Sequence, residues 1–175
     1  DDHPVVRRGL VELFSEADGL SVCGEAGTSA ETLKLVSAAR PDVAVVDLSL
    51  GAESGLDLVA ALAKYDPPVR VLVLSGLDER FYAERALRAG AHGFLGKESA
   101  PDDLLKAVHV VLAGRRYLSP TMSELLISEI DNGGSDRPIH QQLSKREFQI
   151  FCKLASGSSV SEIAPLIRTP GREGA

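Results

Sequence analysis

Three residues that could do chemistry each stand at the end of a short apolar run. They are Asp47, Ser75 and Lys97, and two further carboxylates, Asp1 and Asp2, stand directly before an amphipathic stretch. If the apolar runs are parallel strands, their carboxyl ends meet at one edge of a sheet, where such folds bind their ligands. We therefore expect all five side chains to converge on one site.

The chemistry that this set could perform is phosphoryl transfer. Three carboxylates close together repel one another, and a Mg²⁺ ion, which prefers carboxylate and water oxygens, relieves that repulsion. Asp47 can attack a phosphoryl group and become an acyl phosphate. The Ser75 hydroxyl can donate to one phosphoryl oxygen, and the Lys97 ammonium group can neutralise another. Phosphoryl transfer needs mainly positioning and charge neutralisation, and this set offers both.

Alternating strands and helices must position these residues. Over the first 113 residues, short apolar runs alternate with stretches of helical periodicity. This order is typical of an α/β fold with a doubly wound parallel sheet. The expected strands are 20–26, 43–46, 69–74 and 93–95, and the run 43–46 is predicted to be buried on both faces. The expected helices are 4–14, 31–39, 55–65, 79–89 and 101–113.

The composition excludes several classes of protein. Of 175 residues, 44% are hydrophobic and 25% charged, which is typical of a folded globular chain. A net charge of −6 excludes a basic nucleic-acid footprint over the whole chain. Cys23 and Cys152 have no CxxC partner, which argues against a disulfide scaffold and a cysteine zinc site. No apolar run is long enough to cross a membrane and no signal peptide opens the chain, so we expect a cytoplasmic protein without membrane contacts.

Short motifs surround the candidate residues. They read Asp1-Asp2, Val45-Val46-Asp47-Leu48, Gly55, Leu74-Ser75-Gly76 and Phe94-Leu95-Gly96-Lys97. Together they resemble the receiver domain of bacterial two-component response regulators, over about residues 1–113. The resemblance implies a flavodoxin-like fold and a protein that accepts a phosphoryl group rather than an enzyme.

The resemblance also implies roles for individual residues. Asp47 would accept the phosphoryl group from a sensor histidine kinase. Mg²⁺ would be bound by Asp2 directly, by Asp1 with the help of water, by Asp47, and by the backbone carbonyl of Ser49.

Three further residues receive roles from the same resemblance. Ser75 and Lys97 would contact the phosphoryl group. Phe94 stands where the family keeps its switch aromatic, and an ordinary core phenylalanine is the alternative interpretation. Phosphorylation would draw Ser75 inward and let Phe94 reorient, which would favour a homodimer or release a DNA-binding unit.

The end of the chain carries a second set of motifs. They read Leu143-Ser-Lys-Arg-Glu-Phe148, Leu154-Ala-Ser-Gly157 and Ser161-Glu-Ile-Ala164. These motifs resemble the LuxR-type helix-turn-helix, and a receiver followed by such a unit is the layout of NarL/FixJ-type transcription regulators. The expected domains are a receiver over 1–113, a linker with a short helix over 114–140, and a partial, all-α helix-turn-helix unit over 141–175.

The sequence departs from that family at both ends. No apolar strand precedes Asp1, whereas the family has its first strand there. The tail 168–175 contains Pro170, Gly171 and Gly174, which cannot sustain a recognition helix. Because that helix carries base readout, we assign no DNA-contacting residues, and we expect DNA as a partner only where the C-terminal domain is complete.

Two alternatives remain beside a kinase-driven regulator of transcription. A receiver that cannot bind DNA could act as a phosphate sink or as a heterodimer partner for intact regulators. A Mg²⁺-dependent phosphohydrolase would use the same aspartate chemistry. That second alternative is disfavoured because a general acid is expected two residues after the nucleophile, where this chain has Ser49.

Overall fold

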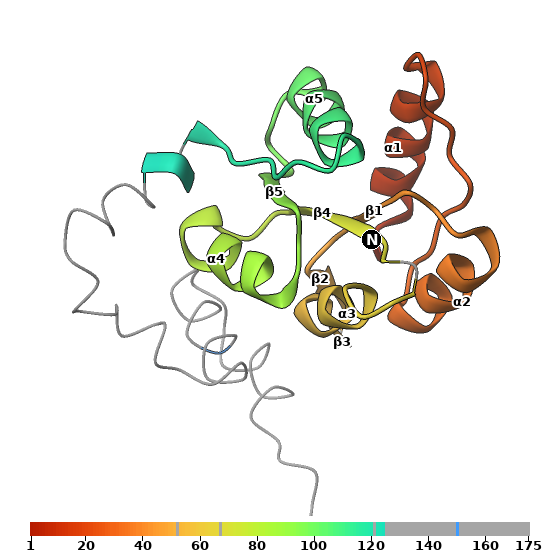
Figure 1. Ribbon diagram of the computed structural model, residues 1–175, viewed down its shortest axis with the longest axis horizontal. Helices are drawn as coiled ribbons and strands as arrows, with labels where there is room; N and C mark the ends of the chain where they lie inside the picture. The colour runs from red at the N-terminus through yellow and green to blue at the C-terminus, as the bar shows by residue number, and fades with distance from the viewer. Residues whose placement is uncertain (52, 67, 121, 125–149, 151–175) are drawn as a thin grey trace, which may run out of the picture. The chain divides into compact units, whose positions relative to one another are not determined.

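The computed structural model describes residues 1–51, 53–66, 68–120, 122–124 and 150 (Figure 1). The chain divides into two compact units, residues 1–127 and residues 128–175, and nearly all of the described residues belong to the first. The helix-turn-helix motifs and the tail 168–175 lie outside the described residues, so their expected roles stay predictions. None of the helices in the described part is both long and apolar enough to span a membrane.

A three-stranded parallel sheet with the order β1-β4-β5 forms the centre of the first unit. Its strands are β1 (Val43–Val46), β4 (Arg70–Ser75) and β5 (Gly93–Gly96). Figure 1 shows α1 (Pro4–Glu16) and α5 (Pro101–Leu112) on one side of the sheet and the helices α2 (Ser29–Ala39), α3 (Gly55–Leu62) and α4 (Glu79–Ala89) on the other. The predicted α/β class, a parallel sheet with helices on both faces, is confirmed.

Local sequence signals explain where the helices begin and end. Thr28 caps α2 because its hydroxyl oxygen accepts from the Glu31 N–H at 3.2 Å. Asp78 caps α4 in the same way, by accepting from the Arg80 N–H at 3.0 Å. Gly90 ends α4 with φ of 112°, a backbone conformation that favours glycine.

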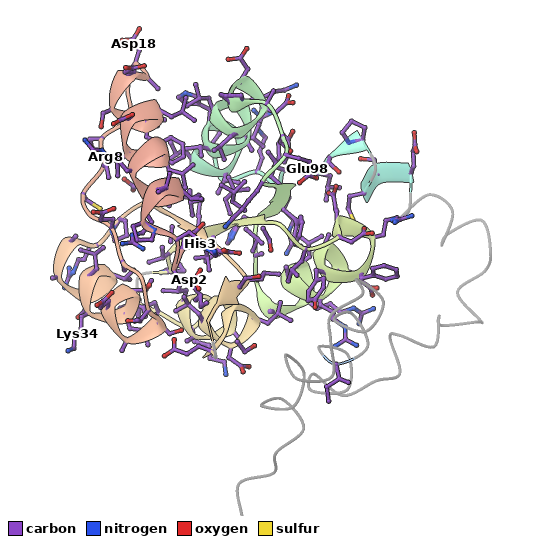
Figure 2. The ribbon with its side chains drawn as sticks, turned by 180° about the vertical axis from the view of Figure 1, so that it is seen from behind. Asp2, His3, Arg8, Asp18, Lys34 and Glu98 are labelled. Carbon is purple, nitrogen blue, oxygen red and sulfur yellow. The ribbon has the colours of Figure 1, made fainter. Side chains whose placement is uncertain are left out.

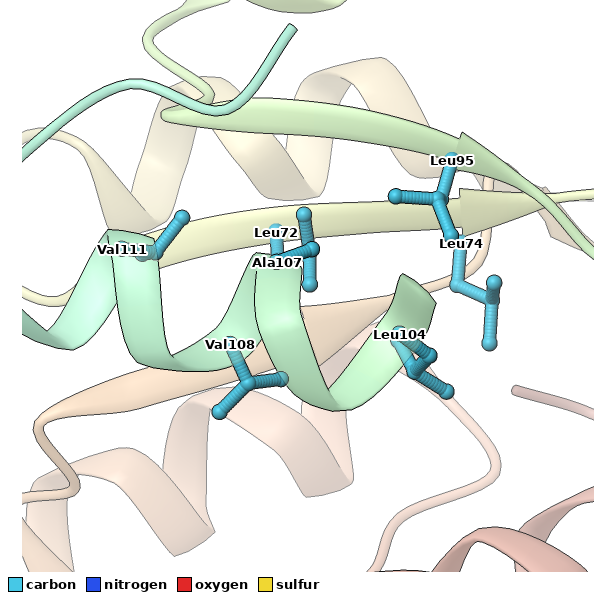
Figure 3. Close-up of a cluster of buried hydrophobic side chains, with 7 residues drawn as sticks. All are labelled: Leu72, Leu74, Leu95, Leu104, Ala107, Val108 and Val111. Carbon is cyan, nitrogen blue, oxygen red and sulfur yellow. The ribbon is translucent and has the colours of Figure 1, made fainter. Parts of the chain in front are cut away.

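One apolar core cluster joins the central strand and β5 to α5. Leu72 and Leu74 of β4 and Leu95 of β5 pack with four residues of α5 (Figure 3): Leu104, Ala107, Val108 and Val111. Full burial of such a leucine or valine side chain stabilises the fold by about 1.5–3 kcal/mol. The cluster therefore anchors β4 and β5 against α5.

The prediction of a strand over 20–26 is wrong, because these residues belong to no strand or helix. A strand needs a ladder partner, and no described segment pairs with this one. A cavity of about 440 Å³ lies beside it, lined by α1, α2, α5 and β1. The prediction that 43–46 is buried on both faces is also wrong for Val43, Ala44 and Val45, which are only half-buried because β1 is the edge strand facing that cavity.

A short antiparallel hairpin follows β1 and was not predicted from the sequence. It pairs β2 (Ser49–Leu50) with β3 (Glu53–Ser54). Gly51, at the turn, has φ of 59°, and this glycine between two short segments was the available signal. The Glu53 carboxylate accepts from the Ser29 N–H at 2.9 Å, which anchors the hairpin to the start of α2.

The segment after α5 packs against the same unit. The Tyr117 N–H donates to the His92 carbonyl at 2.9 Å, and Tyr117 forms an isolated bridge with Gly93 of β5. The Ser119 hydroxyl donates to the Glu79 carboxylate of α4, and its oxygen accepts from the Met122 N–H at 3.0 Å. Residues 120 and 122–124 are helical, at the place where a short helix is expected in the linker.

Candidate functional site

Asp47 follows β1 directly and is buried, with its side chain 1% exposed. Its Oδ1 accepts from the Ser49 N–H at 2.9 Å. Its Oδ2 lies 2.7 Å from Nζ of Lys97. A carboxylate this deeply buried requires such partners, because an unpaired buried charge is strongly destabilising.

Lys97 follows β5 and joins two carboxylates from distant parts of the sequence. Its ammonium nitrogen lies 2.7 Å from Asp47 Oδ2 and 2.6 Å from Asp1 Oδ2. Its backbone N–H donates to the carbonyl of Ser75 at 2.9 Å, so the strand ends of β4 and β5 are tied together. One cation thus faces two of the three carboxylates expected in this site.

Ser75 is the last residue of β4 and is fully buried. Its Oγ accepts from the Leu77 N–H at 3.2 Å. Since this contact uses the oxygen as an acceptor, the hydroxyl hydrogen remains available as a donor. Its predicted contact with a phosphoryl group stays a prediction.

Asp1, Asp2 and His3 directly precede α1, with His3 at its cap position. Figure 2 labels Asp2 and His3 there. The Asp1 Oδ1 accepts from the His3 N–H at 2.8 Å, and Arg7 donates to the Asp1 carbonyl at 2.8 Å. The His3 Nδ1 lies 2.8 Å from Asp2 Oδ1 and 3.3 Å from Asp1 Oδ1. Arg7 in the first turn of α1 thus contacts Asp1, and His3 at the cap position contacts both carboxylates.

Four residues carry atoms that lie close enough together to bind one metal ion. One ligand atom each from Asp1, Asp2, His3 and Asp47 lies within 4.8 Å of the others. Asp2 Oδ1 is buried and has no hydrogen-bond partner among the described residues. Carboxylate oxygens of this kind fit a hard divalent cation such as Mg²⁺, and an orphaned buried oxygen is what such a cation would satisfy.

The hairpin after β1 approaches this cluster from a second side. The Ser49 N–H donates to Asp47. The expected role of the Ser49 carbonyl as a metal ligand stays a prediction. A Cβ placed on Gly51 would lie 3.8 Å from Asp2 Oδ2. The hairpin therefore forms part of the wall of the acidic cluster.

Phe94 lies in β5, three residues before Lys97, with 2% of its surface exposed. It is paired in register with Val73 of the central strand. A buried position of this kind fits both a core residue and an aromatic group that reorients, so its switch role stays a prediction.

The structure thus brings together four of the expected site residues by measured contacts: Asp1, Asp2, Asp47 and Lys97. Ser75 joins them through the backbone of Lys97. From the sequence, His3 adjoins the acidic pair and could touch the metal site, but a solvated histidine at the start of a helix is the preferred interpretation; the structure places its Nδ1 2.8 Å from Asp2 Oδ1. Its position directly after the acidic pair was the only signal in the sequence, and histidine at the start of a helix is common without any ligand.

Comparison with known proteins shows the family of this chain. Residues 1–109 match the response regulator receiver domain. "Probable transcriptional regulatory protein NarL" of Mycobacterium tuberculosis is 37% identical over 164 residues, which is 94% of this chain and 75% of that protein. "Response regulator GacA" of Pseudomonas aeruginosa is 31% identical over 165 residues, which is 94% of this chain and 77% of that protein.

Solved structures agree with the curated relatives. A two-component response regulator of the LuxR family from Aurantimonas sp. SI85-9A1 has a TM-score of 0.70 and 33% identity, over 75% of this chain and 94% of that one. The signal receiver domain of the putative response regulator NarL from M. tuberculosis has a TM-score of 0.62 and 40% identity, over 66% and 93%. With its relatives among NarL- and LuxR-type regulators, the chain belongs to the response regulator receiver family.

Proposed function

We propose that this chain is a phosphorylation switch in which Asp47 accepts a phosphoryl group from a sensor histidine kinase. A carboxylate oxygen of Asp47 attacks the phosphorus of a phosphohistidine. A P–O bond forms, the P–N bond breaks, and its electron pair stays on the imidazole nitrogen, which takes up a proton. The observation that supports this most directly is the buried Asp47 carboxylate facing the Lys97 ammonium nitrogen at 2.7 Å.

The residues around Asp47 divide the remaining work. Lys97 neutralises charge on the incoming phosphoryl oxygens, and the Ser75 hydroxyl donates to one of them. Asp1, Asp2, Asp47 and the Ser49 carbonyl would hold Mg²⁺, which when bound supplies the positive charge that offsets the carboxylates and the phosphoryl group. The acyl phosphate on Asp47 is the product of this transfer, so the chain acts as a phosphoacceptor and not as an enzyme that turns over a separate substrate.

The phosphorylated state would then act on transcription. A new hydrogen bond from the Ser75 hydroxyl to the phosphoryl group would displace the end of β4. Phe94 of the adjacent β5 would then reorient. The relatives are named as a transcriptional regulatory protein and a LuxR-family response regulator. Those names favour control of transcription through a C-terminal DNA-binding domain. Homodimer formation is part of this proposal, and the phosphate sink remains the alternative where DNA is not bound.

The test is phosphorylation of the purified chain by acetyl phosphate with Mg²⁺, read by intact mass. We expect a gain of about 80 Da, one HPO₃ group, that is lost without Mg²⁺ and in Asp47→Asn. Asp18→Asn, at an exposed position just after α1, is the matched control and should gain the same mass. An equal gain in Asp47→Asn, or no gain in a chain with native circular dichroism, would overturn the proposal.

A further inference from the structure

His3 occupies the cap position of α1 without capping the helix. Its backbone has β-region angles, as at an ordinary N-cap, but its side chain accepts no hydrogen bond from the first turn. The imidazole instead lies over the acidic pair, 2.8 Å from Asp2 Oδ1 and 3.3 Å from Asp1 Oδ1. The His3 side chain is 64% exposed, against 6% for Asp1 and 32% for Asp2, so it is the most exposed of the three. Figure 2 labels His3 and Asp2.

The contact between His3 and Asp2 is not a well-formed hydrogen bond. Asp2 Oδ1 is buried and lacks a hydrogen-bond partner among the described residues, although the His3 Nδ1 is only 2.8 Å away. The two atoms are therefore close together without hydrogen-bond geometry between them. Ligands about 2.1 Å from one octahedral cation lie roughly 3.0 Å apart when they are adjacent. The two measured separations, 2.8 and 3.3 Å, bracket that value.

We propose that His3 is a nitrogen ligand that shifts the metal preference of this pocket from Mg²⁺ toward borderline cations such as Co²⁺ and Zn²⁺. Imidazole nitrogen binds these cations well, whereas Mg²⁺ prefers oxygen ligands. The carboxylates of Asp1, Asp2 and Asp47 would supply the negative charge. His3 would supply the preference for Co²⁺ and Zn²⁺ over Mg²⁺. This inference rests on the proposed function, because it concerns the same metal pocket.

The test compares cation affinities of the whole chain and of His3→Ala by isothermal titration calorimetry with Co²⁺, Zn²⁺ and Mg²⁺. We expect the ratio of Co²⁺ affinity to Mg²⁺ affinity to fall about tenfold or more in His3→Ala. The visible absorption of Co²⁺ should also change, because a nitrogen ligand is replaced by water. His109→Ala, an exposed histidine of α5, is the matched control for adventitious surface binding and should leave the ratio as it is.

Each outcome decides between roles of His3. An unchanged affinity ratio in a natively folded His3→Ala would overturn the proposal, and so would an equal loss of affinity for all three cations, since that is a general effect on the cluster. A second readout avoids the variant: Zn²⁺ should shift the ring-proton resonances of His3 in the wild-type chain, and unshifted resonances would contradict a direct bond. Mg²⁺-dependent phosphorylation of the wild type tests the proposed function separately.

Discussion

Lys97 and Asp47 form an ion pair across 50 residues of sequence, with 2.7 Å between Nζ and Oδ2. The Asp47 side chain is 1% exposed and that of Lys97 23%, so the pair is largely removed from water. Each residue follows its own strand, and the two strands are held apart by β4. The pair therefore depends on the whole sheet and reports whether the strand ends have assembled.

Removal of Lys97 should destabilise the chain in the absence of metal. Lys97→Met leaves the Asp47 and Asp1 carboxylates facing each other without a cation, and we expect the free energy of unfolding to fall by about 2–3 kcal/mol. The double variant Asp47→Asn with Lys97→Met should recover much of that loss. Urea unfolding measures the free energy of unfolding of the single and the double variant. Lys106→Met, on an exposed position of α5, is the control, and equal stabilities of all four chains would contradict a native ion pair.

Gly55 permits the loop after Asp47 to close. A Cβ at this position would collide with the backbone of Leu48 and lie 2.6 Å from the Asp47 carbonyl. We expect Gly55→Ala to lower the free energy of unfolding by about 3 kcal/mol and to reduce acetyl phosphate labelling, because the backbone of the acceptor must move.

The matched control for Gly55 is Gly9→Ala, in α1, where a Cβ would meet no atom within 4 Å. Since alanine favours a helix interior over glycine, this variant should gain about 0.5–1 kcal/mol. Thermal unfolding of both variants gives the comparison. Similar changes in the two would show that close packing at Gly55 is not the cause.

His92 should make the stability depend on pH. Its Nδ1 accepts from the Val71 N–H at 3.3 Å, which an imidazolium cannot do. Burial lowers the pKa of His92 below its usual value of 6.5, and Arg116 and Arg70 lower it further. The native state thus favours the neutral ring, so the stabilising effect is complete above pH 6.5 and is lost as pH falls below it.

The check for His92 is the difference in unfolding free energy between wild type and His92→Gln from about pH 5 to 8, the range in which histidine titrates. Glutamine can accept a hydrogen bond and does not titrate, so the wild type should lose stability relative to the variant as pH falls. Parallel profiles would refute the role of His92. His109→Gln, exposed on α5, should follow the wild type.

Ser119 should anchor the segment after α5. Its hydroxyl donates to Glu79 of α4, and its oxygen accepts from the Met122 N–H at 3.0 Å. We expect Ser119→Ala to cost about 1 kcal/mol, as for loss of a helix cap, and to speed amide hydrogen exchange at residues 122–124. Ser37→Ala, exposed in α2, should do neither. Unchanged exchange at 122–124 would show that the anchor is dispensable.

Local sequence determined the elements and much of the site. Apolar runs and helical periodicity placed β1, β4, β5 and the helices α1 to α5, since side-chain burial imposes those periods. Because parallel strands end at a common edge, the residues after them could be assigned to one site from their order along the chain, and Asp47 and Lys97 do lie in contact there.

Tertiary structure decided the features that depend on partners distant in sequence. The run 20–26 has the composition of a strand but no ladder beside it among the described residues, and β1 is half-buried because it borders a cavity. The Asp1–Lys97 contact and the approach of His3 Nδ1 to Asp2 Oδ1 follow from where α1 lies against the sheet. Strand pairing and side-chain contacts of this kind depend on three-dimensional neighbours, which residue types and spacing along one chain do not fix.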